Sequence, residues 1–179
     1  IFENPTSHSG SDLVVGAFLF SFQIYGDFSG YTDIALGTAR LLGIELLQNF
    51  SYPYFSRDIA EFWRRWHISL SSWFRDYIYI PLGGSRKSKI VSIRNIFIIF
   101  LLSGFWHGAN WTFIFWGLLH ALFYIPLFIQ NKNRNNIAII SDVDFKSKSI
   151  ELLKIVMTFS LVTFAWIFFR SSSLTESFN

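Results

Sequence analysis

Histidine is the side chain in this 179-residue chain best suited to proton transfer, and the chain contains no Cys. A neutral imidazole can accept a proton near physiological pH without carrying a permanent charge. Two of the four histidines, His107 and His120, lie in residues 95–131, which contain no Asp, Glu, Lys or Arg. Ionisable side chains in so apolar a segment are costly, which makes them functional candidates. The lack of Cys excludes a thiol nucleophile and thiolate metal ligands.

His107 has the most favourable surroundings for catalysis. It lies within FWHGANW, residues 105–111, where small residues interrupt the apolar run and predict a break between two helices. Irregular backbone at membrane depth is tolerated where protein or a water-filled cavity surrounds it. The small residues after His107 would leave room for a substrate beside the ring. The structural alternative is a neutral histidine that is hydrogen-bonded between helices.

The other three histidines differ in their expected environments. His67 ends the segment EFWRRWH and shares a predicted apolar helix face with Trp63 and Phe74, so its ring should point inward. It would be either a second catalytic group or a structural residue. His120 follows an uninterrupted helical pattern, which favours a structural role. His8 lies in a polar stretch and should be exposed to solvent.

Two carboxylates flank the sequence FSGYT after the apolar stretch 13–26. Asp27 and Asp33 could bind an ion or orient a polar group, but the favoured interpretation is structural, with Asp33 capping a helix over residues 34–47. A metal site is not predicted, because the histidines are scattered and have no His or carboxylate partner at helical spacing.

The elements that must position these residues are predicted to be membrane helices. The chain is 51% apolar and 20% aromatic, which excludes disorder. Residues 95–131 exceed the roughly 20 needed for one span, so we expect two helices, or one broken helix, meeting near 106–111. Residues 13–26 and 155–169 are further candidates. The soluble alternative is a buried helix of a large α protein. The chain begins with Ile, and we expect it to be a piece of a longer multi-pass protein.

Positive charge is concentrated in residues 57–94, which hold eight basic and three acidic residues. The positive-inside rule predicts that this basic segment faces the cytoplasm. Arg64, Ser71 and Arg75 share a predicted polar helix face, as in a helix that lies among lipid headgroups. Binding of nucleic acid is not expected, because the aromatic residues fall on the apolar side and apolar segments lie on both sides of the block. The sequence PLGG at 81–84 should end the helical stretch.

Three motifs resemble the membrane-bound O-acyltransferase (MBOAT) family: FWRRWHISL at 62–70, WFRDYIYIPLGG at 73–84 and GFWHGANW at 104–111. The sequences DFSGYTD at 27–33 and NFSYPY at 49–54 are similar to the bacterial branch of alginate O-acetylation. The likeness covers residues 26–128 and continues more weakly into a last helix at about 152–170. Residues 1–179 would then form part of one family domain.

The resemblance implies an all-α fold of multi-pass transmembrane helices, arranged as a ring with interfacial amphipathic helices, in the bacterial inner membrane. It implies an enzyme that moves an acyl group, acetyl in this branch, from a cytoplasmic donor for O-acetylation of an extracytoplasmic polysaccharide. The donor substrate would be acetyl-CoA, with no bound cofactor or metal. A periplasmic or extracellular acyltransferase would act as partner.

Carried over by position, the resemblance makes His107 the catalytic histidine and His67 the second motif histidine. Arg64 and Arg75 become candidates for holding the anionic donor, because Arg forms bidentate pairs with phosphate. Simple anchoring to lipid headgroups is the alternative for these two residues. Two other functions are weighed against the enzyme: a transporter or channel component with His107 at the permeation site, and an inactive scaffold for a secreted acyltransferase.

Overall fold

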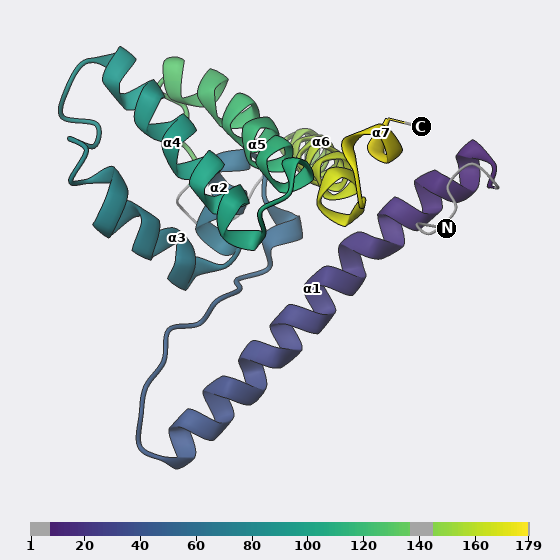
Figure 1. The fold of residues 1–179 in the computed structure, drawn as a ribbon, viewed down its shortest axis with the longest axis horizontal. Coiled ribbons are helices and arrows are strands. Elements are labelled where there is room, and N and C mark those ends of the chain that lie inside the picture. The colour runs from purple at the N-terminus through teal and green to yellow at the C-terminus, as the bar shows by residue number, and fades with distance from the viewer. Residues whose placement is uncertain (1–7, 137–144, 179) are drawn as a thin grey trace.

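The computed structural model describes residues 8–136 and 145–178, and within these ranges the regular structure is entirely helical (Figure 1). The elements in chain order are α1 (Gly10–Leu41), the 3₁₀ turn η2 (Pro53–Phe55), α2 (Ile59–Arg65), α3 (Ile68–Phe74), the π-helical turn η3 (Arg75–Tyr79), α4 (Lys89–His107), α5 (Trp111–Ile129), α6 (Phe145–Arg170) and α7 (Leu174–Ser177). The all-α fold class predicted from the sequence is confirmed.

Four helices among the described residues are long and apolar enough to cross a membrane. They cover Gly10–Leu41, Lys89–His107, Trp111–Ile129 and Lys148–Arg170. At about 1.5 Å of rise per residue, even the 19-residue helices approach the hydrocarbon thickness of a bilayer, roughly 30 Å. The expected last helix at about 152–170 is present, and it begins earlier, at Phe145.

Helices α4 and α5 form a closely packed pair whose backbones touch at two glycines. A Cβ atom added at Gly104 would lie 2.2 Å from the carbonyl oxygen of Phe113, and one at Gly117 would lie 2.2 Å from that of Phe100. Small residues at such positions allow two helices to approach closely. The predicted break between these helices is confirmed, because α4 ends at His107 and Asn110 caps α5 through its side chain.

The predicted helix boundary at Asp33 is wrong, because α1 is one continuous helix from Gly10 to Leu41. The polar residues in its middle do not interrupt the helix, since they bond to its own carbonyl groups: Ser29 Oγ donates to Gly26 O and Thr32 Oγ1 donates to Ser29 O. Asp33 therefore lies inside the helix and does not cap a new one. Figure 1 shows the C-terminal half of α1 extending beyond the other helices.

The prediction of a single amphipathic helix around residues 63–75 is also wrong, because the helix is interrupted at His67 and forms two helices, α2 and α3. His67 adopts left-handed backbone angles, φ 44° and ψ 56°. The segment before η2 supplies hydrogen-bond acceptors at this break: Asn49 O accepts from Ile68 N, and Asn49 Oδ1 accepts from Ser69 N. These bonds satisfy two amide groups at the start of α3 that would otherwise lack partners. The helical stretch ends before Pro81, as predicted.

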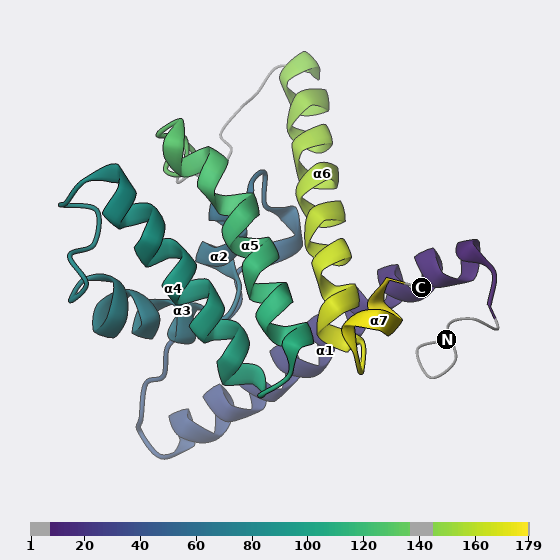
Figure 2. The same ribbon diagram turned by 45° about the horizontal axis from the view of Figure 1, so that its top comes forward.

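The core lies where α2, α5 and α6 meet, and it is mainly aromatic (Figure 2). Its largest buried side chains are Phe62, Trp66, Trp116, Trp166 and Phe168. A buried ion-pair cluster joins this core to the chain before α2. Glu61, 1% exposed, accepts from the guanidinium groups of Arg57 and Arg65, and Arg57 also pairs with Glu151 of α6. Arg57 thus connects Glu61 of α2 with Glu151 of α6.

Candidate active site

His107 is the last residue of α4, at the break that precedes α5. Its side chain is half-buried between aromatic rings, with centroids 4.9 Å from Trp106, 5.3 Å from Trp116 and 4.9 Å from Phe169. Gly108 leaves no space for a larger residue, since a Cβ there would lie 2.7 Å from the ring of Phe113. The helix break lies where the sequence predicted it, and the ring of Phe113 occupies the space that the missing side chain of Gly108 leaves.

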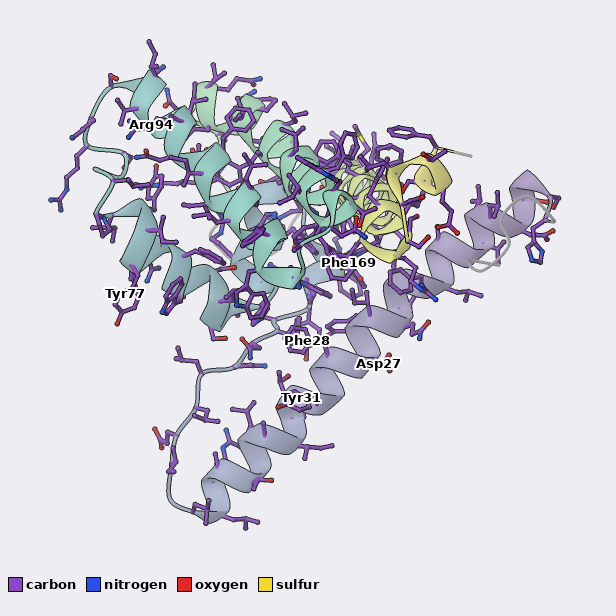
Figure 3. The ribbon with its side chains drawn as sticks, in the orientation of Figure 1. Asp27, Phe28, Tyr31, Tyr77, Arg94 and Phe169 are labelled. Atoms are coloured by element: carbon purple, nitrogen blue, oxygen red, sulfur yellow. The ribbon has the colours of Figure 1, made fainter. Side chains whose placement is uncertain are left out.

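His67 and His107 line the same cavity, which has a volume of about 430 Å³. The two histidines come from different helix breaks, that between α2 and α3 and that between α4 and α5. The remaining lining side chains are mostly aromatic or apolar and come from α1, α2 and α6: Phe20, Gln23, Ile24, Asp27, Phe28, Tyr31, Trp66, Trp166 and Phe169. We call this space the histidine cavity. Figure 3 shows Asp27, Phe28 and Tyr31 on the part of α1 that passes Phe169.

The ring of His67 is fixed by its contacts with Asn49 and Phe28. The Nδ1 atom lies 3.4 Å from Asn49 Oδ1, and the ring centroid lies 4.7 Å from that of Phe28, edge to face. Because the backbone amide of Ser69 donates to the same Asn49 atom, that atom is an oxygen and can only accept. The Nδ1 atom must then carry the proton, which leaves Nε2 with a free lone pair. Burial lowers the pKa of His67 to about 4, so the ring is neutral at physiological pH.

His120 lies outside the histidine cavity and is completely buried in the core. The indole Nε1–H of Trp63 donates to its Nδ1 atom over 3.2 Å, so α2 and α5 are joined by a side-chain hydrogen bond. This placement agrees with the structural interpretation of His120. His8 is exposed, as expected. Within residues 8–136 and 145–178, no three His, Asp or Glu side chains converge as a metal site requires.

Sequence reasoning missed the contribution of α1 to the histidine cavity. Asp27 lines the cavity together with Gln23 and Tyr31, whereas Asp33 does not. The three lining residues recur every four positions, so they lie along one face of the helix. The spacing of four residues is present in the sequence, but it indicates a common helix face only if the helix is continuous. The expected helix boundary near Asp33 therefore hid this relationship.

A second and larger cavity, of about 1070 Å³, lies among α2, α3, α4 and α5. Both Arg64 and Arg75 line it, although they belong to different elements and not to one helix face as expected. Five basic residues contribute to the lining and no acidic residue does; these are Arg64, Arg75, Lys87, Lys89 and Arg134. Arg64 donates to the carbonyl oxygens of Asn133 and Asn136, and Arg75 pairs with Asp76 at 2.7 Å. We call this space the basic cavity.

On α4, residues that line the two cavities lie about one helical turn apart. On α4, Ser103 lines the basic cavity and His107, four residues later, lines the histidine cavity. Four residues of helix correspond to a rise of about 6 Å. At the break between α2 and α3, Trp63 lines the basic cavity and His67 lines the histidine cavity.

A family model for the membrane-bound O-acyltransferase family matches residues 5–173. The chain belongs to this family. The MBOAT family membership agrees with the four apolar helices and confirms the resemblance carried by the three motifs.

Three relatives illustrate where the chain stands within the MBOAT family. It is 43% identical over 96% of its length to the "Probable alginate O-acetylase AlgI" of Pseudomonas syringae pv. tomato, covering 30% of that protein. It is 41% identical over 98% of its length to a peptidoglycan O-acetyltransferase of Helicobacter pylori, covering 32%. A teichoic acid D-alanyltransferase of Bacillus subtilis is 35% identical over 84% of the chain, which covers 39% of that relative. The chain thus spans about a third of the length of these relatives.

Proposed function

We propose that this chain forms the catalytic part of an O-acyltransferase in the bacterial inner membrane. The enzyme would take an acetyl group from a cytoplasmic thioester donor and deliver it for O-acetylation of an extracytoplasmic polysaccharide. The observation that carries the proposal is the convergence of His67 and His107 on one cavity, while the same helix, α4, also lines a second cavity that basic residues surround. The similarity to two O-acetyltransferases and a D-alanyltransferase supports acyl transfer as the reaction class.

In this proposal His107 is the general base. Its neutral ring takes the proton from the acceptor hydroxyl while the hydroxyl oxygen attacks the carbonyl carbon of the thioester. A tetrahedral oxyanion forms and collapses, the carbon–sulfur bond breaks, and the departing thiolate takes the proton back from the imidazolium of His107. The products are the ester and the free thiol of the donor. The aromatic rings around His107 exclude bulk water, which limits hydrolysis of the thioester.

His67 is proposed as the orienting group or the second base of the same reaction. Its Nδ1 proton is held by Asn49, so Nε2 is the atom able to accept a hydrogen bond from the acceptor. The left-handed backbone at His67 directs this ring into the cavity at the junction of two helices. Strained backbone of this kind is concentrated at functional sites.

The basic cavity is the proposed binding site for the donor, acetyl-CoA. Five cationic side chains with no lining carboxylate suit the phosphate groups of such a donor, and arginine pairs with phosphate in a bidentate manner. The positive-inside rule predicts that this surface faces the cytoplasm, where acetyl-CoA is found. Membrane lipid would surround the apolar helices, and a periplasmic acyltransferase would receive the acetyl group or complete its transfer to the polysaccharide.

The proposed function is tested by measuring turnover of acetyl-CoA by the full-length protein in proteoliposomes. His107→Gln should reduce turnover by roughly 10²- to 10⁴-fold, the contribution expected of a general base. His8→Gln is the matched control, since His8 is exposed and lies outside both cavities, and it should leave the rate unchanged. Full turnover by a well-inserted His107→Gln protein would favour the transporter. The absence of turnover in the unmodified protein would favour the inactive scaffold.

A further inference from the structure

The buried imidazole of His120 is the one polar contact of α5 with the tryptophan that begins the motif WRRWH. The indole Nε1–H of Trp63 donates to His120 Nδ1 over 3.2 Å. An indole nitrogen can only donate, so Nδ1 has its lone pair free and the neutral ring carries its proton on Nε2. The His120 side chain is 0% exposed, so residues outside this chain do not reach the ring in this packing.

The second ring nitrogen of His120 contributes nothing to the stability of the core. Its Nε2 atom is buried and has no hydrogen-bond partner among the described residues. A buried donor without a partner costs about as much free energy as one buried hydrogen bond contributes. A leucine would fill the same space without an unpaired polar group. Stability therefore does not require a histidine at this position, and the bond to Trp63 is what the imidazole specifically provides.

Trp63 brings the effect of this bond to the basic cavity, because its half-buried side chain is part of the lining. Phe100 also lines this cavity, and its ring centroid lies 5.3 Å from that of Trp63. The two rings place an aromatic surface in a cavity that otherwise presents five cationic side chains. The bond to His120 fixes the rotation of the indole in this surface, since only one orientation directs Nε1 toward the acceptor.

The acceptor itself is held by aromatic rings from three helices. The ring centroid of His120 lies 6.2 Å from that of Phe62 on α2, 6.3 Å from that of Phe100 on α4 and 4.9 Å from that of Trp116 on α5. His120 lines neither the histidine cavity nor the basic cavity. Any influence on the reaction must therefore pass through the side chains it contacts, and Trp63 is the one to which it is hydrogen-bonded.

We propose that His120 is a positioning residue of the acyl-transfer reaction, which fixes the indole of Trp63 in the wall of the basic cavity. This inference rests on the proposed function, which assigns the basic cavity to acetyl-CoA, and extends it to a residue that touches neither substrate. Because the indole is already oriented before the donor binds, binding does not have to order it. Loss of the bond should weaken donor binding and affect the chemical step at His107 much less.

The test compares two substitutions of His120 in the full-length protein in nanodiscs, with coenzyme A as the probe in isothermal titration calorimetry. His120→Leu keeps apolar packing and removes the acceptor, so the Kd should rise by roughly three- to tenfold, the range expected for one hydrogen bond. His120→Asn is smaller but can place its Oδ1 atom where Nδ1 lay, so its Kd should stay close to that of the unmodified protein.

The melting temperatures of the same two variants should follow the opposite order. His120→Asn leaves a cavity in the core and should melt at a lower temperature, whereas His120→Leu fills the site and should melt close to the unmodified protein. A residue with a merely structural role would weaken binding in the order of lost stability. Phe168→Leu is the matched control, because Phe168 is buried in the core and lines neither cavity. It should lower the melting temperature and leave the Kd unchanged.

Trp63→Phe shows whether the effect passes through the indole. This variant lacks the donor, so adding His120→Leu to it should not change the Kd further. A further increase in Kd in the double variant would overturn the inference. So would a Kd in His120→Leu equal to that of the unmodified protein, or one in His120→Asn as high as in His120→Leu.

Turnover of acetyl-CoA by the same proteins separates this inference from the proposed function. In His120→Leu the KM should rise by the same factor as the Kd, with kcat changed much less. If the unmodified protein binds coenzyme A without turnover, the proposed function fails and the role of His120 is decided by the Kd values. If turnover is normal and the Kd values of the His120 variants are all equal, the inference fails alone. No binding of coenzyme A by the unmodified protein would overturn the assignment of the basic cavity and this inference with it.

Discussion

His67 and His107 are forty residues apart in the chain, and both line one cavity of about 430 Å³. Each is found at a helix break: His67 precedes α3 in a left-handed conformation, and His107 ends α4 before an extended glycine. A helix break frees the backbone from regular packing, so a side chain there can point into a space that neighbouring helices enclose. Two of the three MBOAT motifs, at 62–70 and 104–111, therefore each contain such a break, and both breaks border the same cavity.

The backbone at His67 leads to a prediction that distinguishes the role of the imidazole ring in turnover from the role of the backbone conformation in stability. A residue with φ 44° is strained unless it is Gly or one of the residues, such as Asn and His, that tolerate this region. His67→Asn should keep the melting temperature in detergent close to that of the unmodified protein, whereas His67→Ala should lose about 1 kcal/mol of stability. Both should lose acetyl-CoA turnover. Equal turnover in His67→Asn and the unmodified protein would remove the ring from the mechanism.

The lowered pKa of His67 predicts how its contribution to stability changes with pH. Burial lowers this pKa to about 4, while the pKa of an unfolded histidine is ~6.5. Because the folded state disfavours the proton, the contribution is complete above pH ~6.5 and is lost as the pH falls toward 4. The melting temperature should thus fall more steeply over this window in the unmodified protein than in His67→Asn. If the melting temperature fell with pH equally in both proteins, the lowered pKa could not be that of His67.

The sequence predicted the helix break at His107 because its signal is local. Glycine and alanine follow the histidine directly, and the uncharged stretch around it is too long for one span. The break at His67 has no such signal in EFWRRWHISL. It depends on Asn49, which is distant in sequence and supplies acceptors to Ile68 and Ser69. Tertiary contacts of this kind are invisible to helical periodicity.

The same limitation explains the error at Asp33 and the missed contribution of α1 to the histidine cavity. Glycine, serine and aspartate in DFSGYTD suggested a helix boundary, yet Ser29 and Thr32 bond back to carbonyls within α1 and the helix continues. Once the helix is continuous, the positions of Gln23, Asp27 and Tyr31 on one face follow from its periodicity. Which face meets the histidines is decided by packing of α1 against α6, including the contact between Ser21 and Thr163.

Charge reversal in the basic cavity should weaken donor binding. Arg64→Glu and Arg75→Glu each replace a cation in the lining by a carboxylate that repels phosphate. The KM for acetyl-CoA should rise by about tenfold for either variant, with kcat changed much less. Arg86→Glu is the matched control, since Arg86 lies in the same basic segment and outside the lining. If all three variants had the same KM, the arginines would serve only as membrane anchors.

Alanine at the contact between α4 and α5 should destabilise the fold around His107. The added Cβ in Gly104→Ala or Gly117→Ala would lie 2.2 Å from a backbone oxygen, so the two helices must move apart. We expect a loss of about 1–3 kcal/mol, as for other overpacked cores. Gly37→Ala on α1 has open space around it and should be neutral or slightly stabilising. Thermal unfolding in detergent checks this, and equal melting temperatures for all three variants would contradict the close packing.

The orientation of the basic segment can be tested at Ser88, which caps α4 in the exposed turn beside Lys87 and Lys89. Eight basic residues against three acidic ones in residues 57–94 predict that this turn faces the cytoplasm. Because this chain contains no Cys, Ser88→Cys introduces a unique thiol into it. A membrane-impermeant thiol reagent should label this residue in inverted membrane vesicles and not in intact spheroplasts. Asp12→Cys, an exposed position in the first turn of α1, is a second single-thiol variant that checks the reactivity of the reagent. Labelling of Ser88→Cys in intact spheroplasts would place the basic cavity outside the cell, away from any cytoplasmic donor, and the proposed direction of transfer would fail.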